Sequence, residues 1–217
     1  MCGRFILSKP KLISKRFRAI NKLPLFEPTY NAAPSQMIPV MVKRSPNAVV
    51  LMKWGFVPEW GGEKGISVIN IRSESTKEKP YFKGVLIKRR CIIPSDGFYE
   101  WRMIGDEKVP YYIFLKDKSL FGFAGLYSSL VDAERKRCES FAILTCSPNT
   151  LLKKIHNRMP VILKEKDEDA WLQKDISDTK CLYGFLKPHP SNEMKARSAS
   201  TMVNNTRNDN NKLIKTV

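Results

Sequence analysis

Cys2 has the most reactive chemistry available to this chain, because it directly follows the initiator methionine. A small second residue lets Met1 be removed, and Cys2 would then carry an α-amine and a thiol on adjacent carbons. The reference pKa values of these groups are about 7.7–8.0 and about 8.5, so both are partly deprotonated near neutral pH. The amine can condense with an aldehyde to a Schiff base, and the thiol can then close a thiazolidine ring. Taken alone, these residues also allow a Cys2 that has no chemical role.

Two other residues have surroundings that suit acid–base chemistry. Glu100 is the single carboxylate in the aromatic segment Phe98-Tyr99-Glu100-Trp101, and desolvation raises a carboxyl pKa toward the range of a general acid or base. His156 lies where a predicted short helix ends, and a histidine there can transfer protons near pH 7. The alternatives are an ion pair of Glu100 with an arginine and a histidine that is only a satisfied polar residue.

Several polar and aromatic residues are candidates for ligand binding or for structure. Asn70, Arg72 and Glu74 alternate with other residues, so an extended strand would carry them on one face. If they are buried they need partners, in a structural network or in a binding site. Asn31, in a predicted loop over residues 28–34, either forms a turn or faces a ligand.

Trp54 and Trp60 flank a segment rich in glycine and proline. They either belong to the core or stack on nucleic-acid bases, which is worth about 1–3 kcal/mol per base. Arg158, two residues after His156, could neutralise a phosphate.

The charge balance favours a polyanionic partner. The chain has 38 basic and 21 acidic residues, a formal net charge of +17, which is more than solubility requires. The basic residues are spread along the chain rather than gathered in one amphipathic helix, which favours nucleic acid over a membrane surface. We find no apolar run of transmembrane length and no signal peptide, and we expect a cytoplasmic, nucleoid-associated protein.

Five scattered cysteines without a Cys-x-x-Cys pair and only two histidines argue against a zinc site and against a disulfide framework. We therefore expect reduced thiols, no metal and no cofactor.

The hydrophobic pattern predicts one domain over residues 1–217, with a polar C-terminal segment from about residue 192 that packs back or stays partly loose. The middle of the chain is predicted to be largely antiparallel β structure joined by turns. Predicted strands cover residues 37–42, 49–54, 66–71, 91–94, 109–115, 121–126, 141–145 and 161–163, and predicted helices cover residues 11–21, 81–90, 149–155 and 167–173.

Seven motifs follow one another along nearly the whole chain: Cys2-Gly3-Arg4-Phe5, Tyr30-Asn31-Ala32-Ala33-Pro34, Trp54-Gly55-Phe56-Val57-Pro58, Asn70-Ile71-Arg72-Ser73-Glu74, Gly97-Phe98-Tyr99-Glu100-Trp101, His156-Asn157-Arg158-Met159-Pro160 and Val203-Asn204-Asn205. Together they closely resemble the SRAP (SOS-response-associated peptidase) family. The resemblance implies an α+β fold, a mostly antiparallel β-barrel-like sheet with flanking short helices. It also implies covalent capture of abasic sites in single-stranded DNA during replication or the SOS response.

Carried over by this resemblance, Cys2 is the N-terminal nucleophile, exposed by autoproteolytic loss of Met1, and forms the thiazolidine. Asn70 orients the Cys2 end, Glu100 positions the amine and acts as acid or base, and His156 assists proton transfer as the sugar ring opens and the Schiff base forms. The DNA-contacting set implied in the same way is Arg4, Asn31, Trp54, Arg72 and Arg158. The implied partner is single-stranded DNA with abasic sites, bound by a monomer that also meets replication or repair proteins.

The chain departs from the family pattern at Pro80, where a basic residue often stands; Lys79 is adjacent, so one phosphate contact is displaced or lost. The peptidase label would describe self-processing at Cys2. Two other functions remain open from the sequence: a thiol peptidase with Cys2 as nucleophile and His156 as base, and a non-covalent single-strand binding module with an inert Cys2.

Overall fold

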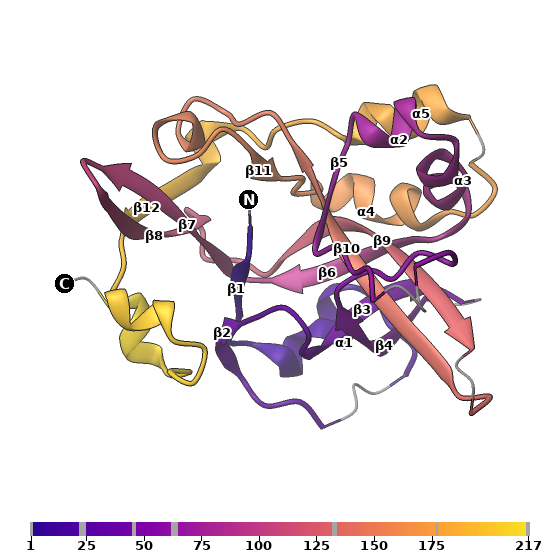
Figure 1. Cartoon of the computed structure of the whole chain (residues 1–217), viewed down its shortest axis with the longest axis horizontal. Coiled ribbons are helices and arrows are strands. Elements are labelled where there is room, and N and C mark those ends of the chain that lie inside the picture. Colours follow the sequence, from indigo (N-terminus) through magenta and orange to yellow (C-terminus); the bar gives the residue numbers. More distant parts are fainter. Residues whose placement is uncertain are drawn as a thin grey trace.

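A closed β-barrel and a second antiparallel sheet make up most of the fold (Figure 1). The computed structural model describes residues 2–21, 25–44, 47–61, 65–131, 134–176 and 178–215. The barrel strands follow one another in the order β10, β4, β3, β6 and β9, and a β9–β10 pairing closes the ring. These strands are β3 (Met37–Lys43), β4 (Asn47–Trp54), β6 (Arg90–Ser95), β9 (Phe121–Val131) and β10 (Arg137–Cys146).

The second sheet has the order β12-β8-β7-β1-β2, with all neighbours antiparallel. Its strands are β1 (Arg4–Leu7), β2 (Thr29–Ala32), β7 (Gly97–Ile104), β8 (Glu107–Leu115) and β12 (Met194–Ser198). The β7–β8 hairpin turns at Gly105, whose φ of +59° suits glycine. Figure 1 shows this hairpin projecting away from the barrel.

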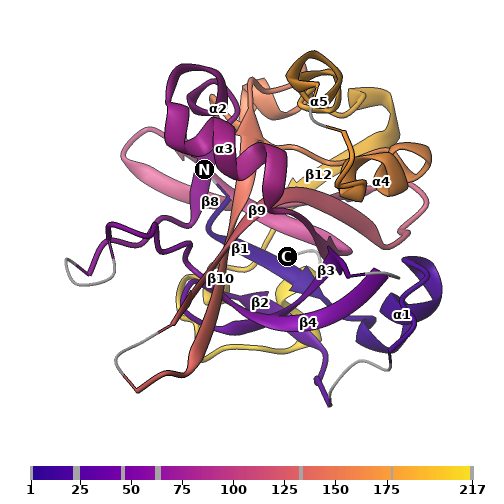
Figure 2. The same cartoon turned by 90° about the vertical axis from the view of Figure 1, so that its right-hand side faces the viewer.

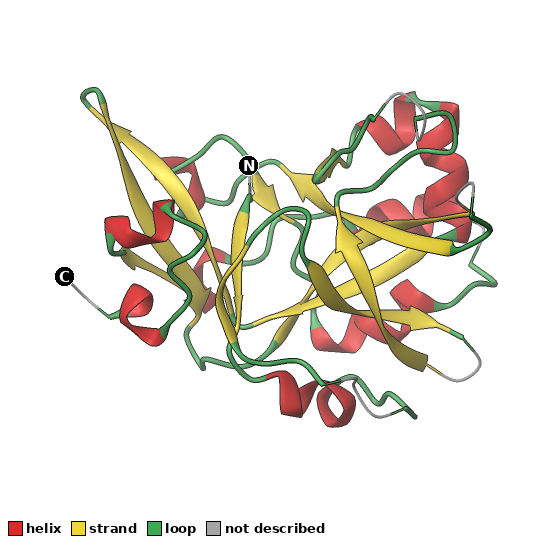
Figure 3. Cartoon of the chain, turned by 60° about the horizontal axis from the view of Figure 1, so that its bottom comes forward, coloured by secondary structure: helices red, strands yellow, loops and turns green. Residues whose placement is uncertain are grey.

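Short helices lie mainly at one end of the barrel. Figure 2 shows α2, α3, α4 and α5 together on that end, and Figure 3 shows that they are brief beside the strands. The helices are α1 (Ile13–Arg16), α2 (Ser75–Glu78), α3 (Pro80–Lys88), α4 (Glu165–Leu172) and α5 (Thr179–Phe185), with 3-10 turns at Pro10–Leu12, Leu152–Lys154, Ser191–Glu193, Thr201–Asn204 and Asn211–Ile214. Two short strands, β5 (Asn70–Arg72) and β11 (Met159–Pro160), lie beside β10.

The N-terminal strand is anchored by the barrel's aromatic core. Phe5 of β1 is fully buried, with its ring centroid 5.0 Å from that of Trp54 and 6.0 Å from that of Phe123. Burying a phenylalanine of this kind stabilises a fold by about 1.5–3 kcal/mol. Because Cys2 lies three residues before Phe5, this packing also fixes where the start of the chain emerges.

A smaller apolar cluster holds the C-terminal segment against the second sheet. Tyr99, Tyr112 and Phe114 pack with Val203 and Leu213, which come from the last 3-10 turns. The polar segment after residue 192 thus packs back on the sheet, and β12 extends that sheet beside β8.

The α+β fold class with a barrel-like sheet is confirmed, as are most of the predicted strands, including residues 37–42, 49–54 and 91–94. The two helices predicted over residues 81–90 and 167–173 are also present, as α3 and α4.

Five local predictions were wrong. The helix over residues 11–21 is one turn, because Arg18 has a φ of +52°. The loop over residues 28–34 contains β2, since its prolines flank rather than interrupt the pairing with β1. The strand over residues 66–71 shrinks to β5, and the strand over residues 161–163 is replaced by β11 and an isolated bridge at Ile162. The helix over residues 149–155 is a 3-10 turn.

Several features of the fold had no counterpart in the predictions. Helix α5 and strands β1, β7 and β12 were not predicted, and β10 runs parallel to both β4 and β5. These parallel pairings join strands that are far apart in the chain, and no local turn signal announces such a pairing.

Candidate active site

Cys2 is held by β5, the short strand that pairs with β10 in parallel. Asn70, the first residue of β5, donates a hydrogen bond from Nδ2 to the Cys2 carbonyl oxygen at 2.8 Å. The parallel register of β5 with β10 sets Asn70 opposite Ile143, so the barrel wall fixes the amide. Met1 lies outside the described residues, and so does the predicted processing of the Met1–Cys2 bond.

The Cys2 thiol is fully buried and lies 3.7 Å from the Arg4 carbonyl oxygen. Burial, followed by the negative charge of Glu100, raises the pKa of the Cys2 thiol far above its usual range. The thiol is therefore protonated at neutral pH, and it needs a nearby base to act as a nucleophile.

Glu100 lies on β7, directly beside the start of β1. The antiparallel register pairs Arg4 with Tyr99, which sets Glu100 level with the residues that lead into β1. The side chain is 2% exposed, and burial raises its pKa to about 7. The predicted rise in pKa is confirmed, and a carboxyl group with this pKa can both accept and donate a proton near neutrality.

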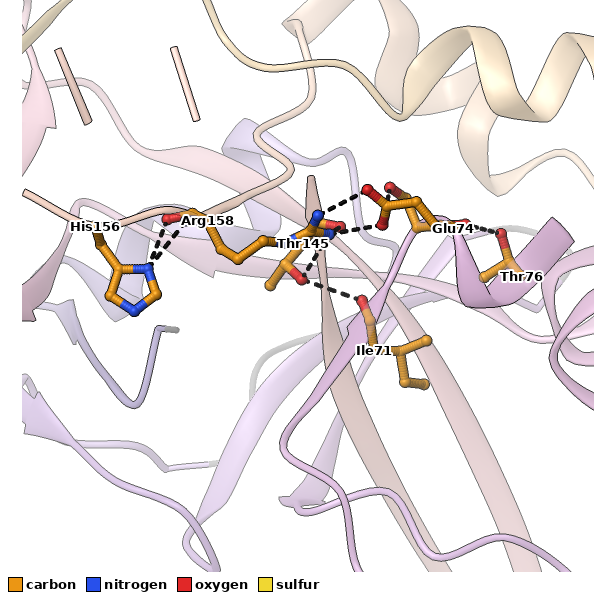
Figure 4. A network of polar contacts seen from close by, with 7 residues as sticks. Ile71, Glu74, Thr76, Thr145, His156 and Arg158 are labelled. Atoms are coloured by element: carbon orange, nitrogen blue, oxygen red, sulfur yellow. Dashed lines mark hydrogen bonds and ion pairs between the residues drawn. The ribbon is translucent and has the colours of Figure 1, made fainter. Parts of the chain in front are cut away.

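His156 follows the 3-10 turn Leu152–Lys154 and lines an open pocket of about 460 Å³ together with Glu100, Trp101, Met103 and Lys108. Burial lowers the pKa of His156, so the imidazole is neutral at pH 7. The backbone N–H of Arg158 donates to His156 Nδ1 at 3.0 Å (Figure 4). This bond favours the tautomer whose proton is on Nε2.

Arg158 makes a bidentate ion pair with Glu74 (Figure 4). Its Nη1 and Nη2 donate to the two carboxylate oxygens at 2.7 and 2.8 Å, and Nη2 also donates to the Thr145 carbonyl oxygen at 2.6 Å. The hydrogen bonds from Arg158 lower the pKa of Glu74 to about 2. The expectation that Glu74 extends the strand of Asn70 and Arg72 was wrong, because β5 ends at Arg72 and Glu74 caps α2.

The residues predicted to contact DNA divide into two groups. Arg72 is exposed at the end of β5, and Arg4 is half-buried with its Nη1 donating to the Gly3 carbonyl oxygen at 2.9 Å. The Arg158 side chain keeps only 14% exposure beside Glu74. Each of these arginines is close in the chain to a residue of the site: Arg4 to Cys2, Arg72 to Asn70 and Arg158 to His156.

Trp54 and Asn31 are buried instead. The Trp54 ring is fully covered, stacks on Phe141 with centroids 6.2 Å apart and donates to the Ile69 carbonyl oxygen at 3.0 Å. Asn31 is 1% exposed, and its Nδ2 donates to backbone carbonyls of the C-terminal segment. Direct DNA contact by these two residues stays a prediction. In the structure, Trp54 packs in the core and Asn31 binds the C-terminal segment to β2.

Met103 and Lys108 were not singled out in the sequence, although both line the pocket. They face each other across the β7–β8 hairpin. The Gly105-Asp106 turn signal could have paired them, and hence added a cation to the pocket beside Glu100.

Neither a metal centre nor a membrane span is found in the described part of the chain. No three His, Cys, Asp or Glu side chains gather there as potential metal ligands. None of the helices described above is both long and apolar enough to cross a membrane.

Known proteins resemble this chain over its full length. It is 39% identical over 221 residues to the abasic site processing protein YoqW of Bacillus subtilis, covering 99% of each chain. It is 37% identical to the abasic site processing protein YoaM of the same organism, covering 99% of this chain and 97% of the relative. A crystal structure of a Bacteroides thetaiotaomicron protein superposes with a TM-score of 0.88 at 26% identity, covering 100% of both chains.

The family comparison agrees with these relatives. Residues 1–206 match the SRAP family, described as SOS response associated peptidase. The chain therefore belongs to the SRAP family.

Proposed function

We propose that this protein processes abasic sites in DNA, and that it captures them in single-stranded DNA through a thiazolidine formed by Cys2 after Met1 has been removed. The observation that carries the proposal is the placement of Cys2, whose carbonyl is held by Asn70 at 2.8 Å and whose thiol lies within electrostatic reach of Glu100. Full-length relatives named abasic site processing proteins support the choice of substrate.

The chemistry begins with the ring-opened sugar of the abasic site, which carries an aldehyde at C1. Opening moves the proton of the C1 hydroxyl to the ring oxygen, and His156 assists this transfer because its favoured tautomer presents an Nε2–H. The Cys2 amine then adds to C1, and loss of one water gives the Schiff base. Glu100, with a pKa of about 7, accepts and returns the protons of these steps.

Ring closure uses the thiol of the same residue. The sulfur attacks C1 of the imine while the thiol proton passes to the imine nitrogen, so no further atom is lost. Since the thiol is fully buried and protonated, the transfer needs a neighbouring base, and Glu100 is the titratable group whose charge most affects the thiol. Holding amine and thiol on one residue makes the second step intramolecular and therefore fast.

Binding of the strand is driven by charge. The surplus of 17 positive charges attracts the phosphates, and Arg4, Arg72 and Lys108 lie around the pocket or the adjoining strand ends. An abasic site carries no base to unstack, so it enters a pocket at lower cost than an intact nucleotide does. We place the protein as a monomer in the cytoplasm near the nucleoid, where replication and repair proteins meet the same lesions.

The peptidase activity in the family description fits removal of Met1 by the chain itself, which exposes the Cys2 amine. A thiol peptidase that cleaves other proteins predicts turnover of added peptides. If the protein is instead a non-covalent binding module, Cys2→Ala should protect DNA as well as the parent protein does. Both alternatives fail if a Cys2-dependent adduct forms.

The test uses purified protein, with its N-terminus checked by intact mass, and a single-stranded oligonucleotide that carries one abasic site. We expect a heat-stable shifted band on a denaturing gel, with a mass equal to protein plus DNA less one water. Intact DNA and Cys2→Ala should give no band, while Cys2→Ala retains salt-sensitive binding because the binding charge lies elsewhere. An adduct that persists in Cys2→Ala refutes the mechanism, and so does its absence from protein that begins at Cys2.

A further inference from the structure

Residues 70–74 connect to both sides of the site. At one end, Asn70 holds the Cys2 carbonyl oxygen at 2.8 Å. At the other, Glu74 holds both terminal nitrogens of Arg158 at 2.7 and 2.8 Å. One short segment thus reaches toward the proposed nucleophile and toward the loop that carries His156.

The base of this segment is anchored to the barrel. β5 pairs with β10 in parallel, with Arg72 opposite Thr145, and the Ser73 N–H donates to the Thr145 carbonyl oxygen at 2.8 Å. Arg158 Nη2 donates to that same carbonyl oxygen at 2.6 Å. The Arg158 guanidinium is therefore held by Glu74 on one side and by the Thr145 carbonyl oxygen of β10 on the other, and its side chain is only 14% exposed.

The position of the Arg158 backbone decides which His156 tautomer is favoured. Nδ1 accepts from the Arg158 N–H at 3.0 Å, but it also lies 3.3 Å from the Arg158 carbonyl oxygen. A small shift of this backbone would let Nδ1 carry the proton and donate to that oxygen, which leaves Nε2 without a proton. Both contacts are drawn in Figure 4.

We propose that Glu74 is a positioning residue for abasic-site capture: by holding Arg158, it keeps His156 in the tautomer with the proton on Nε2. The inference rests on the proposed function, since it assigns the proton-donating role to His156. Glu74 does not line the pocket beside Glu100, and its carboxylate accepts from Arg158 and from the neighbouring Ser73 hydroxyl. Of these two partners, Arg158 is the one that leads to His156. Glu74 follows Asn70 by four residues, so one short segment contacts both Cys2, through Asn70, and Arg158, through Glu74.

The opposing account makes Glu74 a stand-in for phosphate. A carboxylate and a phosphate both accept the paired N–H groups of an arginine, so Glu74 could simply occupy Arg158 until DNA arrives. That account predicts tighter DNA binding when the carboxylate is removed, with an unchanged rate of adduct formation once DNA is saturating. The positioning account predicts the reverse pattern.

The experiment compares Glu74→Gln with the parent protein in single-turnover crosslinking at saturating abasic DNA. We expect the rate constant to fall about tenfold, a loss of about 1.4 kcal/mol of transition-state stabilisation. Binding to an uncleavable abasic analogue, measured in a Cys2→Ala background, should change less than about twofold. Glu74→Asp, which keeps the charge on a shorter side chain, should recover part of the rate.

Glu139→Gln is the matched control. Both oxygens of Glu139 accept from a single nitrogen of Arg44, Nη2, at 2.9 and 3.1 Å, and Glu139 lies on β10 like Thr145, so the variant removes an arginine–glutamate ion pair elsewhere on the barrel. It does not contact the His156 loop, and its rate should equal that of the parent. A slowdown of equal size in Glu139→Gln would overturn the proposal.

Nitrogen NMR reads the tautomer directly. The chain has only two histidines, so long-range ¹H–¹⁵N spectra contain two imidazoles, and loss of one signal set in His156→Gln assigns His156. We expect the Nε2–H pattern in the parent and in Glu139→Gln, and a mixed pattern in Glu74→Gln. An unchanged tautomer in Glu74→Gln overturns the inference. This readout holds even if the parent forms no adduct, which separates failure of the inference from failure of the proposed function.

Discussion

Two carboxylates on opposite sides of the site have opposite environments. Glu100 is 2% exposed, and burial raises its pKa to about 7. The Glu74 side chain is 46% exposed, and hydrogen bonds from Arg158 lower its pKa to about 2. Glu100, on β7 beside β1, can therefore carry protons near neutral pH, whereas Glu74, just after β5, stays negatively charged there. The same functional group can serve as a reactant or as a structural clamp, depending on desolvation and pairing.

Glu168 shows that an arginine partner alone does not decide the outcome. Arg16 donates to both of its oxygens, at 2.7 and 3.0 Å, yet burial still raises the pKa of Glu168 to about 7. Glu74 forms a similar ion pair but keeps half of its side chain in water. Solvent access is therefore the variable that separates an anionic clamp from a proton-holding carboxyl group.

The largest effect should come from removing the proton carrier. Glu100→Gln keeps the shape of the side chain but cannot accept a proton, and general acid–base catalysis contributes about 10²–10⁴-fold. We expect single-turnover adduct formation to slow by at least about 100-fold, while binding to abasic DNA and the folded structure persist. An unchanged rate constant would remove Glu100 from the mechanism, and Glu139→Gln, which does not line the pocket, again serves as the control.

Much of this comparison could be predicted from the sequence. The aromatic segment around Glu100 indicated desolvation, and the structure has the raised pKa. The strands of the barrel were also predictable, because alternating apolar residues and turn signals are local properties. Asn70, Glu100 and His156 came from the family motifs, and the structure places Asn70 against Cys2 and sets Glu100 and His156 in one pocket.

The rest depended on contacts between residues far apart in the chain. Nothing local shows that Arg158 pairs with Glu74, since 84 residues separate them. Trp54 illustrates the same limit, because a tryptophan beside a Gly/Pro-rich loop fits an exposed stacking platform as well as a core. Its burial follows from Phe5 and Phe141, which two different sheets bring to it.

The second prediction concerns stability and pH at Glu100. Its folded pKa of about 7 lies above the reference value of about 4.3, so the native state binds more protons than the unfolded state between these values. The free energy of unfolding should therefore decrease as pH rises from about 4.3 through 7, by at most about 4 kcal/mol. Urea unfolding at pH 5 and pH 8 tests this: Glu100→Gln, which does not titrate, should lose less stability over that interval. Equal losses in both proteins would contradict it.

The smallest effect should come from Glu74 and carry the opposite sign. Its folded pKa of about 2 lies below the reference value of about 4.3, so its contribution is present above pH 4.3 and is lost as pH falls toward 2. Because the side chain is 46% exposed, solvent screening limits this contribution to below about 1 kcal/mol.

Glu74→Gln should then be slightly less stable than the parent at pH 7. This difference in stability should shrink as the pH falls, and it should vanish near pH 2 if both proteins still fold there. Unfolding curves at intervals of one pH unit measure this convergence. A variant that becomes more stable at pH 7 would show that desolvation of Glu74 outweighs its bond to Arg158, and the contrast between the two carboxylates would then be one of degree. Slow adduct formation in a variant that is otherwise almost as stable as the parent would instead locate the role of Glu74 in positioning rather than in holding the fold together.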